Sequence, residues 1–409
     1  MRAADVVIVG AGAAGLSLAH WLHSPAAGTR PPDVVLVDAP PGPLRPPERT
    51  WCFWEGPGGP HDAAVRACWR QLRVRAPGGA ATTVRPEPLR YKMIRSADFA
   101  AAVLGRLGGS PCFRRLQATV TGVRDLADGA EVRGLLPGGD CFTLRARWVY
   151  DSRPLAAPPP ARTALAQHFR GWFVRTRDPV FDPHVADLMD FRTPQPAGGL
   201  SFGYVLPTSA HEALVEYTEF SPAPLDRDAY EAALRHYAEA VLRLGPYRVT
   251  GAEQGLIPMT DGRYRPRAGR SVFSIGTRGG ATRAATGYTF AAVQRQSRAV
   301  AAAFRDGRTP APPPAYGRRA RALDAVMLRA LATGRLDGPA FFSRLFARVP
   351  AERLLRFLDG GTRLWEDLAV GRCVPARPML RSAAELPWLP RRAALPGAVP
   401  GPAARTGAA

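Results

Sequence analysis

Three glycines near the start of the chain have the spacing of a phosphate-binding turn. Gly10, Gly12 and Gly15 follow the apolar run 5–9 and precede a helical pattern over 16–22. The first glycine permits a tight turn, the second lets a phosphate approach the backbone, and the third lets helix and strand pack closely. Because the free N–H groups of the helix point at this turn, the spacing predicts a site for the pyrophosphate of a dinucleotide.

An acidic residue at the end of a second apolar run strengthens this prediction. The run 34–37 ends at Asp38, where a carboxylate suits a ribose hydroxyl. Arg2 with the apolar residues after it also resembles the start of a signal peptide, but the glycines and Asp38 explain the segment better. No stretch approaches the ~20 apolar residues of a membrane span, so we expect a cytoplasmic protein that is not integral to a membrane.

Composition limits the class of protein. A chain of 409 residues, 46% of them hydrophobic, has room for two domains with their own cores. The five cysteines are an odd number without CxxC or Cys/His ligand spacing, and the seven histidines are scattered. We therefore expect neither a disulfide scaffold nor a metal site.

The net charge of +21 is typical of nucleic-acid-binding proteins. Lys92 is the only lysine, however, so arginine supplies 54 of the 55 basic residues, and Gly (41) and Pro (42) are abundant. GC-rich coding produces this composition, and the sequence has no nucleic-acid-binding motif. We attribute most of the charge to coding bias and the rest to attraction toward an anionic membrane face, and expect no nucleic-acid partner.

The first part of the chain reads as alternating strand and helix patterns. Residues 39–60 form a Pro/Gly-rich loop with an aromatic island. A helix is expected over 96–107, capped by Ser96, and strands over 112–151. This order predicts a Rossmann-type α/β domain.

The rest of the chain predicts an insertion into that domain and then helices. Strand patterns and a helix over 226–244 follow a Pro/Ala-rich linker, and a short strand at 272–276 with a helix over 286–304 returns to the first domain. We expect the first part of the nucleotide domain over 1–153, a β-rich substrate domain over 154–250 and a return segment over 251–308. A helical region over 309–385 and a disordered tail over 386–409 follow.

Further segments, in a fixed order, match a known family. They are 49–55, 149–153, 202–207 with 214–218, 255–259, and 276–280 with 286–290. Together with the opening glycines they resemble the flavin-dependent lycopene β-cyclase family of carotenoid biosynthesis. The likeness spans about residues 5 to 380.

The resemblance implies a Rossmann-type FAD-binding domain interrupted by a β-rich substrate domain. Enzymes of this family catalyse an isomerisation without net redox change, although they need reduced FAD, with NAD(P)H as the usual electron donor. One ψ end of a linear carotenoid such as lycopene is protonated, and the cation closes a six-membered ring. Loss of a proton then leaves a β-ionone ring, giving γ-carotene or β-carotene.

The resemblance makes Glu216 the candidate catalytic residue, because it matches the first glutamate of the family's acidic strand motif. Alternation along the strand puts Leu214 and Thr218 on the face of Glu216 and Tyr217 on the other. A glutamate facing an apolar cavity would have a raised pKa and hold a proton near neutral pH. The alternative is a solvated glutamate on a half-exposed strand. Tyr217 stands where many members have a second acid, so that acid's role is lost or moved here.

The resemblance also implies a set of cofactor contacts. Asp151 follows a buried strand on the flavin side, and Arg95 could meet a flavin phosphate or ribityl group; a turn aspartate and a surface arginine are the alternatives. Thr277 stands where many FAD hydroxylases have an aspartate, so the helix from Thr286 would offer N–H groups instead. The expected contacts are Gly10, Ala11, Gly12, Ala14, Gly15, Asp38, Arg95, Asp151, Gly276, Gly279, Gly280 and Gly287.

Two apolar regions have both a structural and a functional interpretation. Trp51, Phe53 and Trp54 pack a loop onto the domain, and one of them is a candidate for stabilising a cation. Apolar residues alternate with arginine over 341–349 and 354–358, as in an interfacial helix or a core-facing amphipathic one. Because lycopene is dissolved in lipid, we expect peripheral contact with the inner membrane face in this region.

Two other functions remain open from the sequence. A flavin-dependent oxidoreductase, either an aromatic hydroxylase or a prenyl-lipid reductase, shares the opening motif and the inserted domain. A non-catalytic flavin- or lipid-binding protein would bind FAD and form no product. Stoichiometry separates the enzymes, because an oxidoreductase consumes NAD(P)H with each product and a cyclase does not.

Overall fold

Two valine-rich runs form the centre of the nucleotide-binding sheet. The structure, a computed structural model, describes residues 4–24 and 30–393. β1 (Ala4–Val9) lies parallel between β2 (Val34–Asp38) and β11 (Cys141–Asp151), and such continuous apolar runs are typical of strands buried on both faces. The strand order is β8-β2-β1-β11-β10-β9, with β17 also paired to β11. The other strands are β8 (Phe113–Gln117), β9 (Thr119–Leu126), β10 (Gly129–Leu135) and β17 (Val272–Ser274).

Three helices share an apolar core with this sheet: α1 (Ala13–Leu22), α2 (Ser96–Leu107) and α4 (Phe290–Arg305). The expected start of α4 at Thr286 is wrong. Gly287 has φ +72°, a left-handed conformation that interrupts a helix, so α4 begins after it.

The expected capping role of Ser96 is also wrong. α2 begins at Ser96, but its N-cap is Arg95 and no side chain caps it. The Ser96 hydroxyl instead accepts a hydrogen bond of 2.9 Å from the Arg49 backbone N–H. The serine therefore ties the backbone just before Thr50 to the start of α2 rather than closing the helix end.

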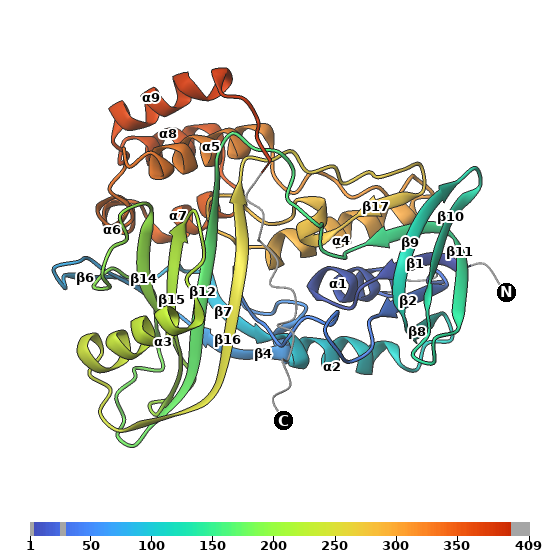
Figure 1. Cartoon of the computed structure of the whole chain (residues 1–409), viewed down its shortest axis with the longest axis horizontal. Coiled ribbons are helices and arrows are strands. Elements are labelled where there is room, and N and C mark those ends of the chain that lie inside the picture. The colour runs from blue at the N-terminus through green and yellow to red at the C-terminus, as the bar shows by residue number, and fades with distance from the viewer. Residues whose placement is uncertain (1–3, 25–29, 394–409) are drawn as a thin grey trace, which may run out of the picture.

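The inserted sheet draws strands from more of the chain than expected. Its order is β16-β12-β15-β14-β13-β5-β6 (Figure 1). β16 continues past the division expected at 250/251 and pairs with β12 as far as Thr260, while β5 and β6 come from within 1–153. The strands are β5 (Gln71–Arg75), β6 (Ala81–Val84), β12 (Ala164–Thr176), β13 (Val185–Asp190), β14 (Leu200–Pro207), β15 (Glu212–Ser221) and β16 (Tyr247–Thr260).

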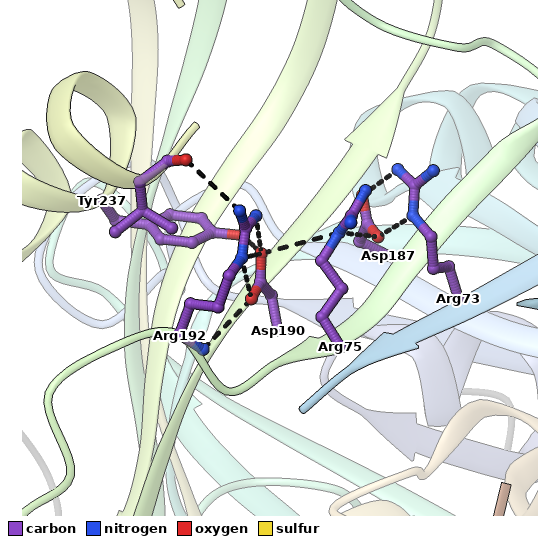
Figure 2. Close-up of polar contacts among 7 residues, drawn as sticks. Arg73, Arg75, Asp187, Asp190, Arg192 and Tyr237 are labelled. Carbon is purple, nitrogen blue, oxygen red and sulfur yellow. Dashed lines mark hydrogen bonds and ion pairs between the residues drawn. The ribbon is translucent and has the colours of Figure 1, made fainter. Parts of the chain in front are cut away.

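A buried ion cluster attaches β5 to this sheet, as Figure 2 shows. Arg73 pairs with Asp187 on β13, and the Arg75 guanidinium lies 3.5 Å from the same carboxylate. Asp190 is fully buried and pairs with Arg192. Because lone carboxylates are costly to bury, these pairs explain how an arginine-bearing strand is held beside β13.

A small sheet of β3, β7 and β4 lies between the two larger sheets (Figure 1). β3 (Thr50–Glu55) pairs with β7 (Arg90–Arg95), which also pairs with β4 (Val65–Trp69). The aromatic island expected in a loop over 39–60 is therefore a strand. Alternation along β3 points Trp51 and Phe53 at the nucleotide-domain core and Trp54 at the inserted sheet.

Helices cover both faces of the inserted sheet. One face packs on α3 (Arg227–His236) and the π-helix Tyr237–Val241. The other shares a core with the C-terminal helices, whose apolar residues Phe341, Phe342, Leu354 and Leu355 are buried, so the core-facing interpretation holds for them. These helices are α5 (Arg318–Ala332), α6 (Gly338–Arg348), α7 (Ala351–Leu358), α8 (Leu364–Gly371) and α9 (Ala376–Glu385). Within the described ranges, no helix is both long and apolar enough to span a bilayer.

Part of the expected disordered tail is ordered. The 3₁₀ helix Leu386–Trp388 follows α9, and Arg392 forms a β-bridge with Ala161 in the first linker. Arg391 pairs with Asp261 at 3.5 Å. Expectations for 394–409 lie outside the described residues.

Candidate active site

The glycine turn between β1 and α1 has space for a phosphate. Gly10 has φ +97°, and a Cβ on Gly15 would lie 1.9 Å from the Gly10 carbonyl oxygen. A Cβ on Gly12 would meet nothing within 4 Å, and no side chain caps α1 or places an acid in its first turn. The helix N-terminus therefore offers free N–H groups beside open space, as an anion site requires.

The return segment lies against this turn. Gly276 has φ +63°, and a Cβ there would lie 2.9 Å from the Ala14 side chain. Gly279 and Gly280 follow in a short 3₁₀ helix and its left-handed end. The structure thus brings Gly276 to the start of α1, as expected for two parts of one cofactor site.

Gly287 lies at a second place with unsatisfied polar atoms. A Cβ there would lie 2.3 Å from Gln167 Oε1 on β12. Gln167 Oε1 and Thr286 Oγ1 are buried and have no hydrogen-bond partner among the described residues. Because buried polar atoms are normally paired, these two atoms are available to a polar group of a bound cofactor.

The three charged residues of the expected cofactor set all have protein partners. Asp38 is at the end of β2 and pairs with Arg115 at 2.7 Å. Asp151 pairs with Arg153 at 2.9 Å. Arg95 pairs with Glu48 at 2.8 Å and lies 4.2 Å from the centre of the Phe173 ring, against the inserted sheet.

Glu216 lies on the face of β15 that packs toward the small sheet and the C-terminal helices. It is 6% exposed, and Thr218 Oγ1 donates a 2.7 Å hydrogen bond to its Oε1. Burial, and then the nearby charge of Glu253, raise the pKa of Glu216 to about 8. The carboxyl group is therefore protonated at neutral pH and can act as an acid.

A second buried carboxylate, Glu253, lies across the sheet from Glu216 and was not expected from the sequence. Gly171 on β12 pairs with Glu216 on one side and Glu253 on the other, so both glutamates share one face. A Cβ on Gly171 would lie 2.8 Å from Leu214. Thr50 Oγ1 donates a 2.8 Å hydrogen bond to Glu253 Oε2, and burial raises the pKa of Glu253.

Tyr217 lies on the opposite face, where its hydroxyl donates a 2.7 Å hydrogen bond to Glu219. An acid at that position would share no face with Glu216, so Glu253 supplies the second carboxylate on the Glu216 face. The length of β16 and its register are the signal that would have identified Glu253.

A connected cluster of aromatic side chains begins at the cross-strand neighbour of Glu216. Tyr204 is its cross-strand neighbour on β14, and the Tyr91 hydroxyl lies 2.5 Å from that of Tyr204 and 2.8 Å from that of Tyr288. Trp54 packs edge-on against Tyr288 with ring centres 4.6 Å apart. These aromatic faces could stabilise a cation in a site with little water.

The fold defines the structural class of the chain. It is similar to the fold of solved flavin-dependent oxidoreductases and halogenases, and structures that share it come from several organisms. One is a geranylgeranyl bacteriochlorophyll reductase-like protein from Thermoplasma acidophilum, with TM-score 0.59, 14% identity, and coverage of 94% of this chain and 97% of that chain. Another is p-nitrophenol 4-monooxygenase from Pseudomonas putida, with TM-score 0.60, 17% identity, and coverage of 88% and 99%. A flavoprotein/dehydrogenase from Cytophaga hutchinsonii has TM-score 0.61, 13% identity, and coverage of 95% and 99%.

The sequence identifies the family within this class. A search of curated proteins found no match. The profile of the lycopene cyclase protein family matches residues 5–384, nearly the whole chain, so the chain belongs to this family.

Proposed function

We propose that the protein is a lycopene β-cyclase, which closes a linear carotenoid ψ end group into a β-ionone ring. The observation that carries the proposal is Glu216, a buried carboxyl group with a pKa of about 8 beside aromatic rings. An acid of this kind protonates a double bond without water being present. Membership of the family supports the substrate class.

The proposed reaction moves protons and causes no net redox change. Glu216 donates its proton to the terminal double bond, leaving a tertiary cation and a carboxylate. The neighbouring double bond attacks the cation and closes the ring, which moves the positive charge onto a ring carbon. A proton from the adjacent carbon then returns to the Glu216 carboxylate, so the product is an isomer and the acid is regenerated. We propose that the rings of Trp54 and Tyr288, which pack edge-on against each other, stabilise the cation, and exclusion of water prevents its capture as an alcohol.

We propose FAD in reduced form as the cofactor, with NAD(P)H as the electron donor. The uncapped turn at Gly12, the contact of Gly276 with Ala14 and the unpaired Gln167 Oε1 fit this group. When bound, reduced flavin supplies negative charge that stabilises a nearby cation. The α1 N-terminus would hold the phosphate of this group, and Gln167 on β12 would offer it a polar atom.

The test is expression in cells that accumulate lycopene, followed by chromatography of the pigments. γ-Carotene or β-carotene is the expected product. Unchanged lycopene beside folded, flavin-bound protein would contradict the proposal. Consumption of NAD(P)H in proportion to product would instead favour an oxidoreductase, such as a hydroxylase or prenyl-lipid reductase. Because lycopene is dissolved in lipid, we also propose that the protein works at the inner membrane face.

A further inference from the structure

Exposed apolar side chains gather at one end of the chain's C-terminal helices. Among the described residues, ten large apolar side chains are exposed, and five of them lie within 364–388. Trp388 is the most exposed, at 87%, and Leu380 is 68% exposed. The others are Leu364, Trp365 and Leu368. The expected membrane residues of α6 and α7 are buried, so this is a different surface.

The helical spacing puts these side chains on continuous faces. Leu364, Leu368 and Arg372 recur at intervals of four residues along and just beyond α8. On α9, Leu380 and Arg381 follow Arg377 by three and four residues. Figure 1 places α9 at the outer edge of the helical layer. We call this surface, formed by α8, α9 and Leu386–Trp388, the C-terminal face.

The charge of the C-terminal face has one sign. Its exposed arginines form no ion pair with any of the residues the structure describes: Arg363 and Arg372 at the ends of α8, and Arg377 and Arg381 on α9. The acids on the same elements are all paired with arginines of neighbouring segments. Glu366 pairs with Arg356, Asp367 with Arg319, and Glu385 with Arg335. The positive charge of these exposed arginines is therefore not neutralised, and it lies on the same elements as the exposed tryptophan and leucine side chains.

We propose that the C-terminal face docks on an anionic lipid bilayer. Exposed tryptophans and leucines insert at the headgroup level, while unpaired arginines contact lipid phosphates. A second copy of the chain is the less favoured occupant, because a symmetric interface would bring the positively charged arginines of the two copies together. The choice of lipid rests on the proposed function, whose substrate is dissolved in lipid.

Flotation of the full-length protein with vesicles tests the proposal. The vesicles are pure phosphatidylcholine or phosphatidylcholine with about one third phosphatidylglycerol. The protein is expected to float with the anionic vesicles and much less with the neutral ones. Arg377→Glu with Arg381→Glu should weaken flotation at least tenfold, since each charge reversal replaces attraction by repulsion. Trp388→Ser should weaken it with little effect on folding, because that side chain is almost fully exposed.

A matched control reverses two exposed arginines on another helix. Arg227→Glu with Arg235→Glu on α3 makes the same change in net charge and should leave flotation unchanged. If both double variants lose flotation equally, the vesicles attract the net charge of the whole molecule, and the proposal is overturned. It is also overturned if the α9 double variant floats as well as the wild type. If light scattering shows that those variants dissociate a dimer while flotation persists, a second copy is the occupant. Cyclisation of detergent-dispersed lycopene by each variant tests the proposed function separately.

Discussion

At the scale of single residues, the site depends on one proton held by a buried carboxyl group. Glu216 holds it because burial on the apolar face of β15 costs more for the charged form than for the neutral one. Glu253 adds a like charge from two strands away, and Gly171, which lies between them on β12, carries no side chain of its own. The proton affinity of Glu216 therefore depends on the register of the sheet as well as on the residue itself.

We expect Glu216→Gln to reduce cyclisation at least about 10²-fold while bound flavin is retained, because the amide cannot donate the proton. In the wild type, activity should fall as pH rises through about 8, where the carboxyl group loses its proton. Pigment formation by purified protein against pH is the measurement. Glu219→Gln, a buried glutamate on the opposite face of the same strand, is the control and should keep the wild-type pH profile.

Glu253→Gln should move the alkaline limb of the activity profile to lower pH, by on the order of one unit. The substitution removes the like charge that raises the pKa of Glu216, so Glu216 ionises earlier. The same pigment assay follows the shift. An unchanged limb would mean that burial alone sets the proton affinity of Glu216.

At the scale of elements, the β1–α1 turn is shaped by backbone contacts on one side and left open on the other. We expect Gly12→Val to lose FAD, because its side chain would occupy the open space at the helix N-terminus. The flavin-free melting temperature should stay within about 2 °C of the wild-type apoprotein. Gly15→Val should destabilise the apoprotein as well, since its Cβ would overlap the Gly10 carbonyl. Flavin absorbance and thermal melting separate the two effects, and a normal flavin content in Gly12→Val would contradict the assignment of the turn.

The segment after α9 is an element rather than a free tail. Removing 386–409 should lower the melting temperature by a few degrees, since it takes away the buried Leu386 and the Arg391–Asp261 pair. Removing only 394–409 leaves those contacts in place and is the matched control. Equal melting temperatures for the two truncations would show that the contacts of 386–393 contribute nothing.

At the scale of the whole molecule, a buried ion pair joins the C-terminal helices to the nucleotide domain. Arg283, in the return segment before α4, pairs with Asp324 on α5 at 2.9 Å, and both are buried. Asp324→Ala should cost about 3–5 kcal/mol in the free energy of unfolding, because it leaves an uncompensated buried charge. Denaturant unfolding measures this. The double variant Arg283→Met with Asp324→Leu should recover much of the loss, and failure to do so would mean that the pair acts through more than charge.

The sequence by itself determined the parts whose signals are local. The glycine spacing, the valine-rich strands ending at Asp38 and the faces of the Glu216 strand follow from backbone periods of a few residues. Each is confirmed in β1, α1, β2 and β15. The family resemblance was likewise carried by short segments in order, and the family match over 5–384 confirms it.

Only the tertiary structure decided which distant segments meet. Glu253 is 37 residues from Glu216 in the chain (253 minus 216), and they share a face because β12 pairs with both of their strands. β5 joins the inserted sheet through its parallel ladder with β13 and through ion pairs with Asp187. The outward face of α8 and α9 depends on which side of each helix the core covers. Strand pairing and burial are long-range interactions, so no local pattern specifies them.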